Sequence, residues 1–131
     1  KKKVILLPQK QITRYQRSFT RLKLFSDFVF MTNKHYILKG RKLKEVKLLE
    51  WAEWFETAER HIGDDTINGK RVSTVFLGID HNFAFDGPPL LFETMVFGDD
   101  GKGDEEETER YSTYEEAEEG HKRIVKKYGS Q

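Results

Sequence analysis

The sequence contains no cysteine, which excludes a disulfide framework and a thiolate metal site and leaves the redox compartment open. No uninterrupted apolar run approaches the roughly 20 residues that a helix needs to cross a bilayer. The sequence also has no internal repeat and no specific metal-binding spacing such as His-Glu-x-x-His. We therefore expect a soluble chain inside the cell.

The sequence does contain enough apolar material for one core. Of its 131 residues, 37% are hydrophobic and 13% are aromatic, which is typical of a packed globular protein. The length suits a single domain with one modest core. Charged residues make up 34% of the chain, above the globular average of roughly 25%.

The net charge of +1 conceals an asymmetry along the chain. Residues 1–30 hold eight Lys/Arg and a single acid, Asp27, whereas residues 31–131 hold 15 basic and 21 acidic residues. This split is typical of a basic arm on an acidic domain. Met31 begins a segment that resembles a natural start, so residues 1–30 are either a basic N-terminal extension or not part of the native protein. We expect residues 31–131 to form a single α+β domain.

If residues 1–30 are native, their pattern predicts a basic amphipathic helix. Apolar residues recur at three- and four-residue spacing with basic residues between them: Ile12, Tyr15, Phe19, Leu22 and Phe25. Such a helix suits a membrane surface, nucleic-acid phosphates or an acidic partner. The alternative is an appendage that folds over its own acidic domain.

From residue 35 onward the hydrophobic periodicity predicts strands and helices. A short strand is predicted over residues 35–39, and an amphipathic helix over residues 45–62 that ends at Gly63. A turn is predicted over residues 64–69, where Asn68 and Gly69 favour a tight reversal. Strands follow at about 71–80 and 90–97, with a short one at 108–111.

The last segment predicts a second amphipathic helix, opened by a capping box at Thr113 and Glu116. The Gly-rich acidic segment 99–107 before it predicts a solvated, mobile loop. The resulting order is β-α-β-β-β-α. This order predicts an α+β fold, in which two amphipathic helices pack on one face of a small antiparallel sheet of three or four strands.

Four side chains are the candidates for chemistry: Asp80, His81, Glu93 and His121. Carboxylates and imidazoles serve acid–base catalysis and bind divalent metals, for which Asp80, His81 and Glu93 are the candidate ligands. Successive strand residues point to opposite faces, so Asp80 and His81 share a site only if the strand ends between them. If the hairpin pairs Gly78 with Glu93, then Glu93 joins Asp80 on one face, and a one-residue shift reverses this.

The same residues have a purely structural interpretation. Asp80 lies at a strand end, where aspartate makes turn bonds, and Glu93 can pair with a lysine or arginine. His121 lies on the apolar stripe of its helix, as a hydrogen-bonded core histidine would. Because no spacing matches a catalytic motif, we favour a protein that is not an enzyme and has no cofactor.

The Gly-Pro-Pro loop between the hairpin strands is the candidate binding element. Its Phe83, Phe85 and Pro88 would dock on a partner, since aromatic residues anchor interfaces. The alternative is a stiff loop whose phenylalanines fold into the core.

Residues 99–119 form an acidic run, with 11 Asp/Glu against Lys102 and Arg110. Such a run would grip a basic partner or mimic nucleic-acid phosphate. The alternative is a solvated loop followed by an exposed helix face. Calcium binding is not favoured, because the EF-hand spacing of glycine and glutamate is absent.

Four blocks occur in order along the chain: residues 51–56 (WAEWFE), 72–81 (VSTVFLGIDH), 87–98 (GPPLLFETMVFG) and 110–121 (RYSTYEEAEEGH). Together they resemble small uncharacterised proteins of bacteriophage and prophage genomes. The resemblance covers residues 31–128 and does not include residues 1–30. Within it, the acidic segment 99–107 differs from the family pattern. It implies no activity, but it implies the cytoplasm of a phage-infected bacterial cell as the setting.

These patterns predict a small phage or prophage accessory protein that acts by binding a host or phage macromolecule. We expect a protein partner, and nucleic acid only through residues 1–30 if they are native. Two alternatives stay open: a small metal-dependent hydrolase or nucleotide-acting enzyme using Asp80, His81, Glu93 and His121, and a minor structural protein of the virion. The sequence does not indicate an oligomeric state.

Overall fold

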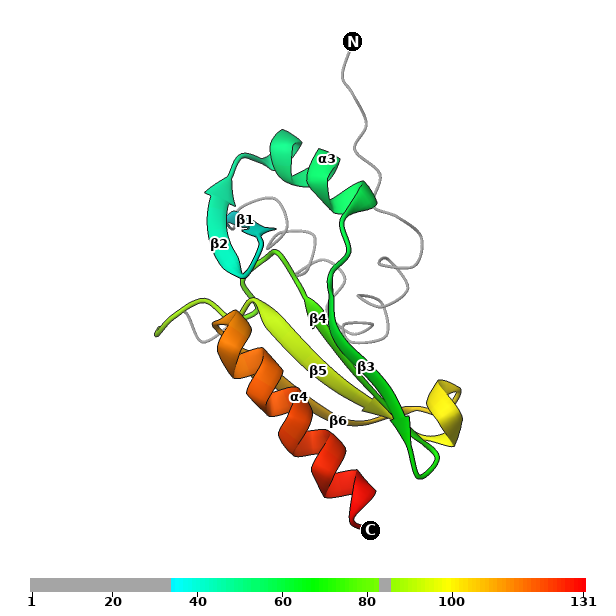
Figure 1. Ribbon diagram of the computed structural model, residues 1–131. Coiled ribbons are helices and arrows are strands. Elements are labelled where there is room, and N and C mark those ends of the chain that lie inside the picture. The colour runs from blue at the N-terminus through cyan, green and yellow to red at the C-terminus, as the bar shows by residue number, and fades with distance from the viewer. Residues whose placement is uncertain (1–33, 83–85) are drawn as a thin grey trace. The chain divides into compact units, whose positions relative to one another are not determined.

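The computed structural model describes residues 34–82 and 86–131 (Figure 1). The predicted N-terminal extension, the start at Met31 and the aromatic residues Phe83 and Phe85 lie outside the described residues. The chain divides into two compact units, Lys1–Ala58 and Glu59–Gln131, and each is described by itself. Within the described residues, no helix is long and apolar enough to cross a membrane.

The described part of the first unit is a β-hairpin followed by a helix. β1 (His35–Lys39) pairs antiparallel with β2 (Lys42–Val46) through a two-residue turn, and α3 (Leu48–Thr57) follows. Gly40 opens that turn with a φ of +64°, which glycine adopts without steric cost. Trp51 and Phe55, about one helical turn apart, are buried and stack with ring centroids 4.4 Å apart.

The predicted strand over residues 35–39 is confirmed, whereas α3 is shorter than the predicted helix. The helix ends at Thr57, because Ala58 adopts an extended ψ of 139°. Ile62, which continues the helical spacing in the sequence, belongs instead to β3 (His61–Ile67), where strand pairing overrides the helical pattern. The pattern does not predict β2, because its exposed and mostly charged side chains give no clear hydrophobic signal.

The second unit is a four-stranded antiparallel sheet with a helix on one face. β4 (Lys70–Phe76), β5 (Phe92–Phe97) and β6 (Glu105–Tyr111) join β3 in the order β3-β4-β5-β6. A short 3-10 turn, η1 (Asp99–Gly101), precedes β6. α4 (Tyr114–Gly129) lies across the sheet and contacts all four strands (Figure 1). The predicted α+β class is confirmed.

The sheet face that α4 covers carries two apolar layers. Phe76 of β4 faces Phe92 of β5, with ring centroids 5.2 Å apart. The other layer combines cross-strand valines with residues of the helix: Val72, Val96, Ile124 and Tyr128. Because strand side chains alternate, the cross-strand pair Thr74 and Thr94 lies on this same face between the two layers.

Two local signals in the second unit are confirmed. Asn68 and Gly69, with φ of +48° and +75°, form the two-residue turn between β3 and β4, as in a type I′ turn. Thr113 caps α4 by accepting a hydrogen bond from the Glu116 amide at 3.1 Å. Two boundaries differ from prediction: residues 64–67 lie in β3 rather than in a turn, and β6 begins at Glu105, inside the predicted loop.

Candidate functional site

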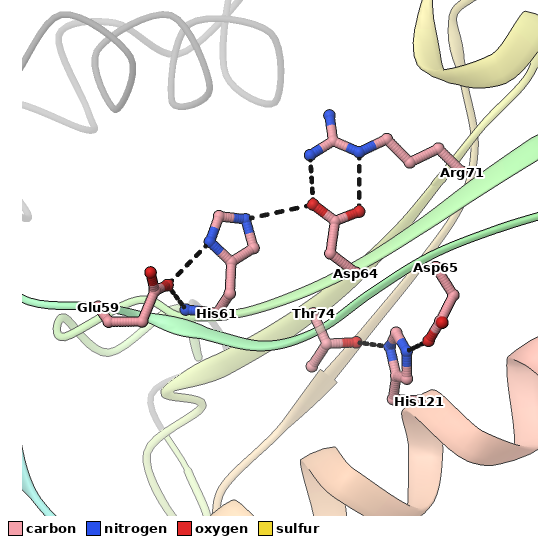
Figure 2. A network of polar contacts seen from close by, with 7 residues as sticks. All are labelled: Glu59, His61, Asp64, Asp65, Arg71, Thr74 and His121. Atoms are coloured by element: carbon pink, nitrogen blue, oxygen red, sulfur yellow. Dashed lines mark hydrogen bonds and ion pairs between the residues drawn. The ribbon is translucent and has the colours of Figure 1, made fainter.

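A chain of hydrogen bonds runs through the layer between the sheet and α4. His121 Nε2 lies 2.6 Å from Asp65 Oδ2, and His121 Nδ1 lies 2.7 Å from Thr74 Oγ1 (Figure 2). Thr74 Oγ1 lies 2.5 Å from Thr94 Oγ1, which accepts a bond from the Tyr111 hydroxyl at 3.1 Å. These five residues, which come from all four strands and the helix, are called the His121 chain below.

The donors along the His121 chain point in one direction. In the tautomer with its proton on Nε2, His121 donates to Asp65, and its Nδ1 accepts from Thr74. In that arrangement the Thr74 hydroxyl accepts from Thr94, which accepts from Tyr111. Each threonine hydroxyl then has a partner on either side, and neighbouring bonds polarise each other.

Two glycines leave room for the rings of the His121 chain. A Cβ on Gly63 would lie 2.5 Å from Nε2 of His121, and a Cβ on Gly120 would lie 2.3 Å from the phenol ring of Tyr111. Both distances are well below a van der Waals contact. Gly63 also adjoins the irregularity in the pairing of β3 with β4. The rings occupy the space that these two missing side chains leave.

The His121 chain has the residue types of a catalytic triad, but its exposure is reversed. Thr74 is 0% exposed, whereas the Asp65 side chain is 57% exposed. A nucleophile must reach its substrate, so the buried Thr74 hydroxyl is not placed to act as one. The geometry instead satisfies polar groups that α4 buries against the sheet.

The sequence singles out His121 but not its partners on the strands. The signal for two of them is present: Thr74 and Thr94 lie within apolar runs, and a hydroxyl on a buried strand face needs a partner. Asp65 gives no such signal, because it lies in a segment whose composition predicts a turn. The structure places His121 as a hydrogen-bonded core histidine, which matches its structural interpretation.

Asp80, the first of the other predicted residues, ties together the two sides of the loop between β4 and β5. Its Oδ1 accepts hydrogen bonds from the amides of Asn82 at 2.7 Å and Leu90 at 2.8 Å. The side-chain amide of Asn82 donates to the carbonyls of Asp86 and Pro88, the latter at 3.2 Å. We call this set of bonds the loop frame. It holds the described residues of the loop in one conformation.

His81 is buried and neutral. Its Nδ1 donates to the Ile79 carbonyl at 2.8 Å, and its amide donates to the Leu90 carbonyl at 2.9 Å. Burial lowers the pKa of His81 to about 4, and the positive charge of Arg110 acts in the same direction. At pH 7 the ring therefore carries its proton on Nδ1 and its lone pair on Nε2.

Glu93 is buried on the sheet face opposite α4. Its side chain is 4% exposed, and its Oε2 lies 2.9 Å from Nε of Arg110, whose side chain is 27% exposed. Arg110 is its direct cross-strand neighbour on β6. Glu93 is thus a buried carboxylate compensated by a cation, as its structural interpretation predicts.

The predicted pairing of Gly78 with Glu93 is wrong. Glu93 pairs with Val75, three residues earlier on β4. The strand ends at Phe76, and Gly78 adopts a φ of +78°, which breaks the extended backbone. The regular alternation of strand side chains therefore ends before Asp80. It does not place Asp80 and Glu93 on one face of the sheet.

The four side chains predicted for chemistry are each held by different partners. Within residues 34–82 and 86–131, no three His, Asp or Glu side chains are grouped so that they could hold a metal ion. The described geometry therefore offers nothing in favour of Asp80, His81 and Glu93 as metal ligands.

Much of the acidic run at residues 99–119 is paired within the protein. Glutamates of β6 bond to cations on β4 and α4: Glu106 to Lys70, Glu107 to Lys127 and Glu109 to Arg123. The bonds from Lys127 and the Tyr128 hydroxyl lower the pKa of Glu107. Backbone pairing with β5 makes residues 105–107 part of a strand where the composition predicts a solvated loop. The ion pairs neutralise part of the charge that a basic partner would need.

A second polar cluster lies on the exposed side of β3 (Figure 2). Arg71 donates two hydrogen bonds to Asp64, at 2.9 and 2.6 Å. His61 lies 3.1 Å from Glu59 through Nδ1 and 3.8 Å from Asp64 through Nε2. Exposed pairs of this kind contribute little to stability.

Comparison with known proteins does not identify the chain. No family model, curated protein or solved structure matches it.

Proposed function

We propose that this chain is a small bacteriophage or prophage accessory protein that acts in the cytoplasm of a bacterial host by binding a protein. The binding element is the loop between β4 and β5. The observation that carries this proposal is the loop frame, in which Asp80 and Asn82 tie both sides of the loop together. Asp86, Gly87 and Pro88 are exposed next to this frame.

A framed loop is suited to binding for an entropic reason. Residues that hydrogen bonds already hold, here Asp80, Asn82 and Leu90, lose little conformational freedom when a partner docks next to them. Pro88 and Pro89 restrict the backbone further. The sequence also places Phe83 and Phe85 in this loop, and aromatic side chains are frequent anchors of interfaces.

The phage setting is supported by the resemblance of the four sequence blocks, one of which begins at Gly87 in this loop. The hydrolase alternative receives no comparable support. In the part of the chain that the structure describes, the carboxylates and imidazoles nominated for it hold the fold together.

The test is site-specific photo-crosslinking in phage-infected bacterial cells. A benzophenone amino acid replaces Asp86 in the loop, and a matched control replaces Glu119 on α4, whose side chain is 77% exposed. We expect one discrete protein adduct from position 86 and none from position 119. An adduct with a capsid or tail protein would instead support the virion alternative.

Loop variants then decide whether the adduct reports specific binding. Phe83→Ala/Phe85→Ala in the crosslinking protein should abolish the adduct, and Asp80→Ala should weaken it because the frame opens. With the purified partner, the double variant should bind at least about tenfold more weakly, or about 1.4 kcal/mol. Equal adducts from positions 86 and 119, or an adduct that survives the double variant, would refute the proposal.

A further inference from the structure

The β1–β2 hairpin and the residues that flank it concentrate positive charge. Six basic residues surround one acid, Glu45, between residues 34 and 47, and all six are exposed: Lys34, Lys39, Arg41, Lys42, Lys44 and Lys47. Lys34 lies 3.5 Å from Glu45, and Lys44 lies 3.9 Å from Glu50 of α3. Such exposed pairs leave the lysines accessible to another anion.

Three of these lysines share one face of the hairpin. Lys39 is the direct cross-strand partner of Lys42, and Lys44 lies two residues further along β2. Among the described residues, Lys39 and Lys42 form no ion pair. We call Lys39, Lys42 and Lys44 the lysine face.

The lysine face works against the stability of the hairpin. Like charges directly opposite each other on neighbouring strands destabilise a sheet. The two-residue turn at Gly40 fixes this register, so Lys39 and Lys42 cannot avoid each other by slipping along the strands. An anion bound across the pair would remove the repulsion.

The chemistry of the lysine face fits phosphate better than a protein surface. On this face of the hairpin, the exposed side chains next to the turn are the three lysines, and the apolar side chain of Ile37 is buried. Cores of protein interfaces are depleted of lysine and use aromatic or apolar anchors. Phosphate backbones are bound by lysine and arginine contacts that need no apolar anchor.

The charge distribution along the whole chain supports the same partner. The basic segment continues past residue 30 and includes the hairpin: residues 1–47 hold 14 Lys/Arg and two acids, Asp27 and Glu45. Residues 48–131 hold nine basic and 20 acidic residues. A basic segment of this kind is the electrostatic signature of a nucleic-acid contact.

We propose that the β1–β2 hairpin binds the phosphate backbone of a nucleic acid through Lys39, Lys42 and Lys44. Shape permits this, because a two-stranded ribbon fits the DNA major groove, which is about 12 Å wide. Contacts to phosphate position a protein without reading bases, so the binding does not depend on sequence. The residues of this surface and the class of its partner differ from those of the framed loop and its protein partner.

The test measures binding of the full chain to labelled duplex DNA of about 20 base pairs between about 50 and 200 mM salt. Single-stranded DNA and duplex RNA of equal length show which form of phosphate backbone is preferred. The variant is Lys39→Gln/Lys42→Gln. The control is Lys122→Gln/Lys126→Gln, which removes the same charge from exposed positions on α4.

We expect the wild type to bind duplexes of different sequence equally and to lose affinity as salt rises. The hairpin variant should bind more weakly, with a log–log salt slope smaller by about 2, and the control should keep the wild-type slope. Over a fourfold rise in salt, the wild type should therefore lose about tenfold more affinity than the hairpin variant.

Three results would overturn the proposal. One is no binding to any of the nucleic acids at the lowest salt. A second is an unchanged log–log salt slope in the hairpin variant. That result would mean that other cations, such as those of residues 1–30, make the phosphate contacts. A third is binding to poly-glutamate with none to nucleic acid, which would identify an acidic protein as the partner. Far-ultraviolet circular dichroism confirms that each variant is folded.

Discussion

The phenol ring of Tyr111 lies directly against the backbone of Gly120. A Cβ on that glycine would lie 2.3 Å from Cε1, Cζ and the hydroxyl oxygen of the tyrosine. The contact joins β6 to α4 at the place where Tyr111 donates into the His121 chain through Thr94. The helix can therefore lie this close to the sheet only where it has no side chain.

Gly120→Ala should destabilise the protein although it raises helix propensity. Alanine is favoured over glycine inside a helix by about 1 kcal/mol, whereas overpacking a core costs about 1–3 kcal/mol. Because the added Cβ would lie only 2.3 Å from the ring, the overpacking cost should lie in the upper part of this range, about 2–3 kcal/mol, so we expect a net loss of about 1–2 kcal/mol in the free energy of unfolding, measured by urea denaturation. The control is Gly129→Ala, whose Cβ would meet only the movable end of the Ile67 side chain, with Cδ1 2.8 Å away. An alanine at position 120 as stable as wild type would contradict the close contact.

Thr94→Val should break the His121 chain at its centre while keeping the shape of the side chain. The Tyr111 hydroxyl then loses its acceptor, and Thr74 loses a donor. A buried polar group left without its partner costs about 1–3 kcal/mol, which urea denaturation measures. Thr66→Val at an exposed position of β3 is the control and should change stability by less than about 0.5 kcal/mol. Equal losses of stability in Thr94→Val and Thr66→Val would show that the hydrogen bonds of the His121 chain do not stabilise the fold.

His81 should make the protein less stable in acid. Its pKa is about 4 in the folded protein, against 6.5 for an ordinary histidine. Between these values the unfolded chain binds a proton that the folded protein does not, so stability falls as pH drops from about 6.5 toward 4. The loss amounts to about 3 kcal/mol, and no change from this group is expected above pH 7.

The measurement is the free energy of unfolding at a series of pH values for wild type and His81→Asn. The asparagine amide can still donate to the Ile79 carbonyl, but it does not titrate. The difference between the two curves isolates His81 from the carboxylates that also titrate in this range. Parallel curves between pH 7 and 4 would rule out a buried, neutral His81.

Arg110→Met should leave Glu93 as a buried carboxylate without its cation. Removing one partner of a buried ion pair costs about 3–5 kcal/mol, and the partial exposure of Arg110 places the expected loss near the lower end of that range. Adding Glu93→Gln to the same protein removes the stranded charge, so the double variant should recover most of the stability. Thermal and urea unfolding measure both proteins. A double variant no more stable than Arg110→Met would disprove the role of the carboxylate.

The features that could be predicted from the sequence are those that neighbouring residues determine. The turn at Asn68 and Gly69 and the cap at Thr113 follow from side chains within a few positions. β3 could not be recognised, because the spacing of Ile62 suits a helix and only pairing with β4 makes it a strand. Such pairing depends on residues far along the chain.

The candidate site shows the same division. That His121 is a core histidine follows from its place on the helix stripe, but its bonds to Asp65 and Thr74 span 56 and 47 positions and require the assembled sheet. Local sequence signals also could not predict which residue of β4 pairs with Glu93. Gly78 ends the strand through its positive φ, and a glycine letter alone does not reveal its backbone angles.

The strand order of the second unit has a consequence for how the chain folds. Each strand of β3-β4-β5-β6 pairs only with its neighbours along the chain, so no pairing needs a crossover connection, and the closure entropy stays low even for the longest loop, residues 77–91, because it grows only slowly with loop length. Sheets built from such local pairings assemble faster than those with long crossovers. α4 is the last element of the unit, and the acceptor for Thr74 lies on it. A helix that docks one turn out of place takes the imidazole away from Thr74, whose buried hydroxyl then keeps only its bond to Thr94, so the polar layer favours the correct docking at the end of folding.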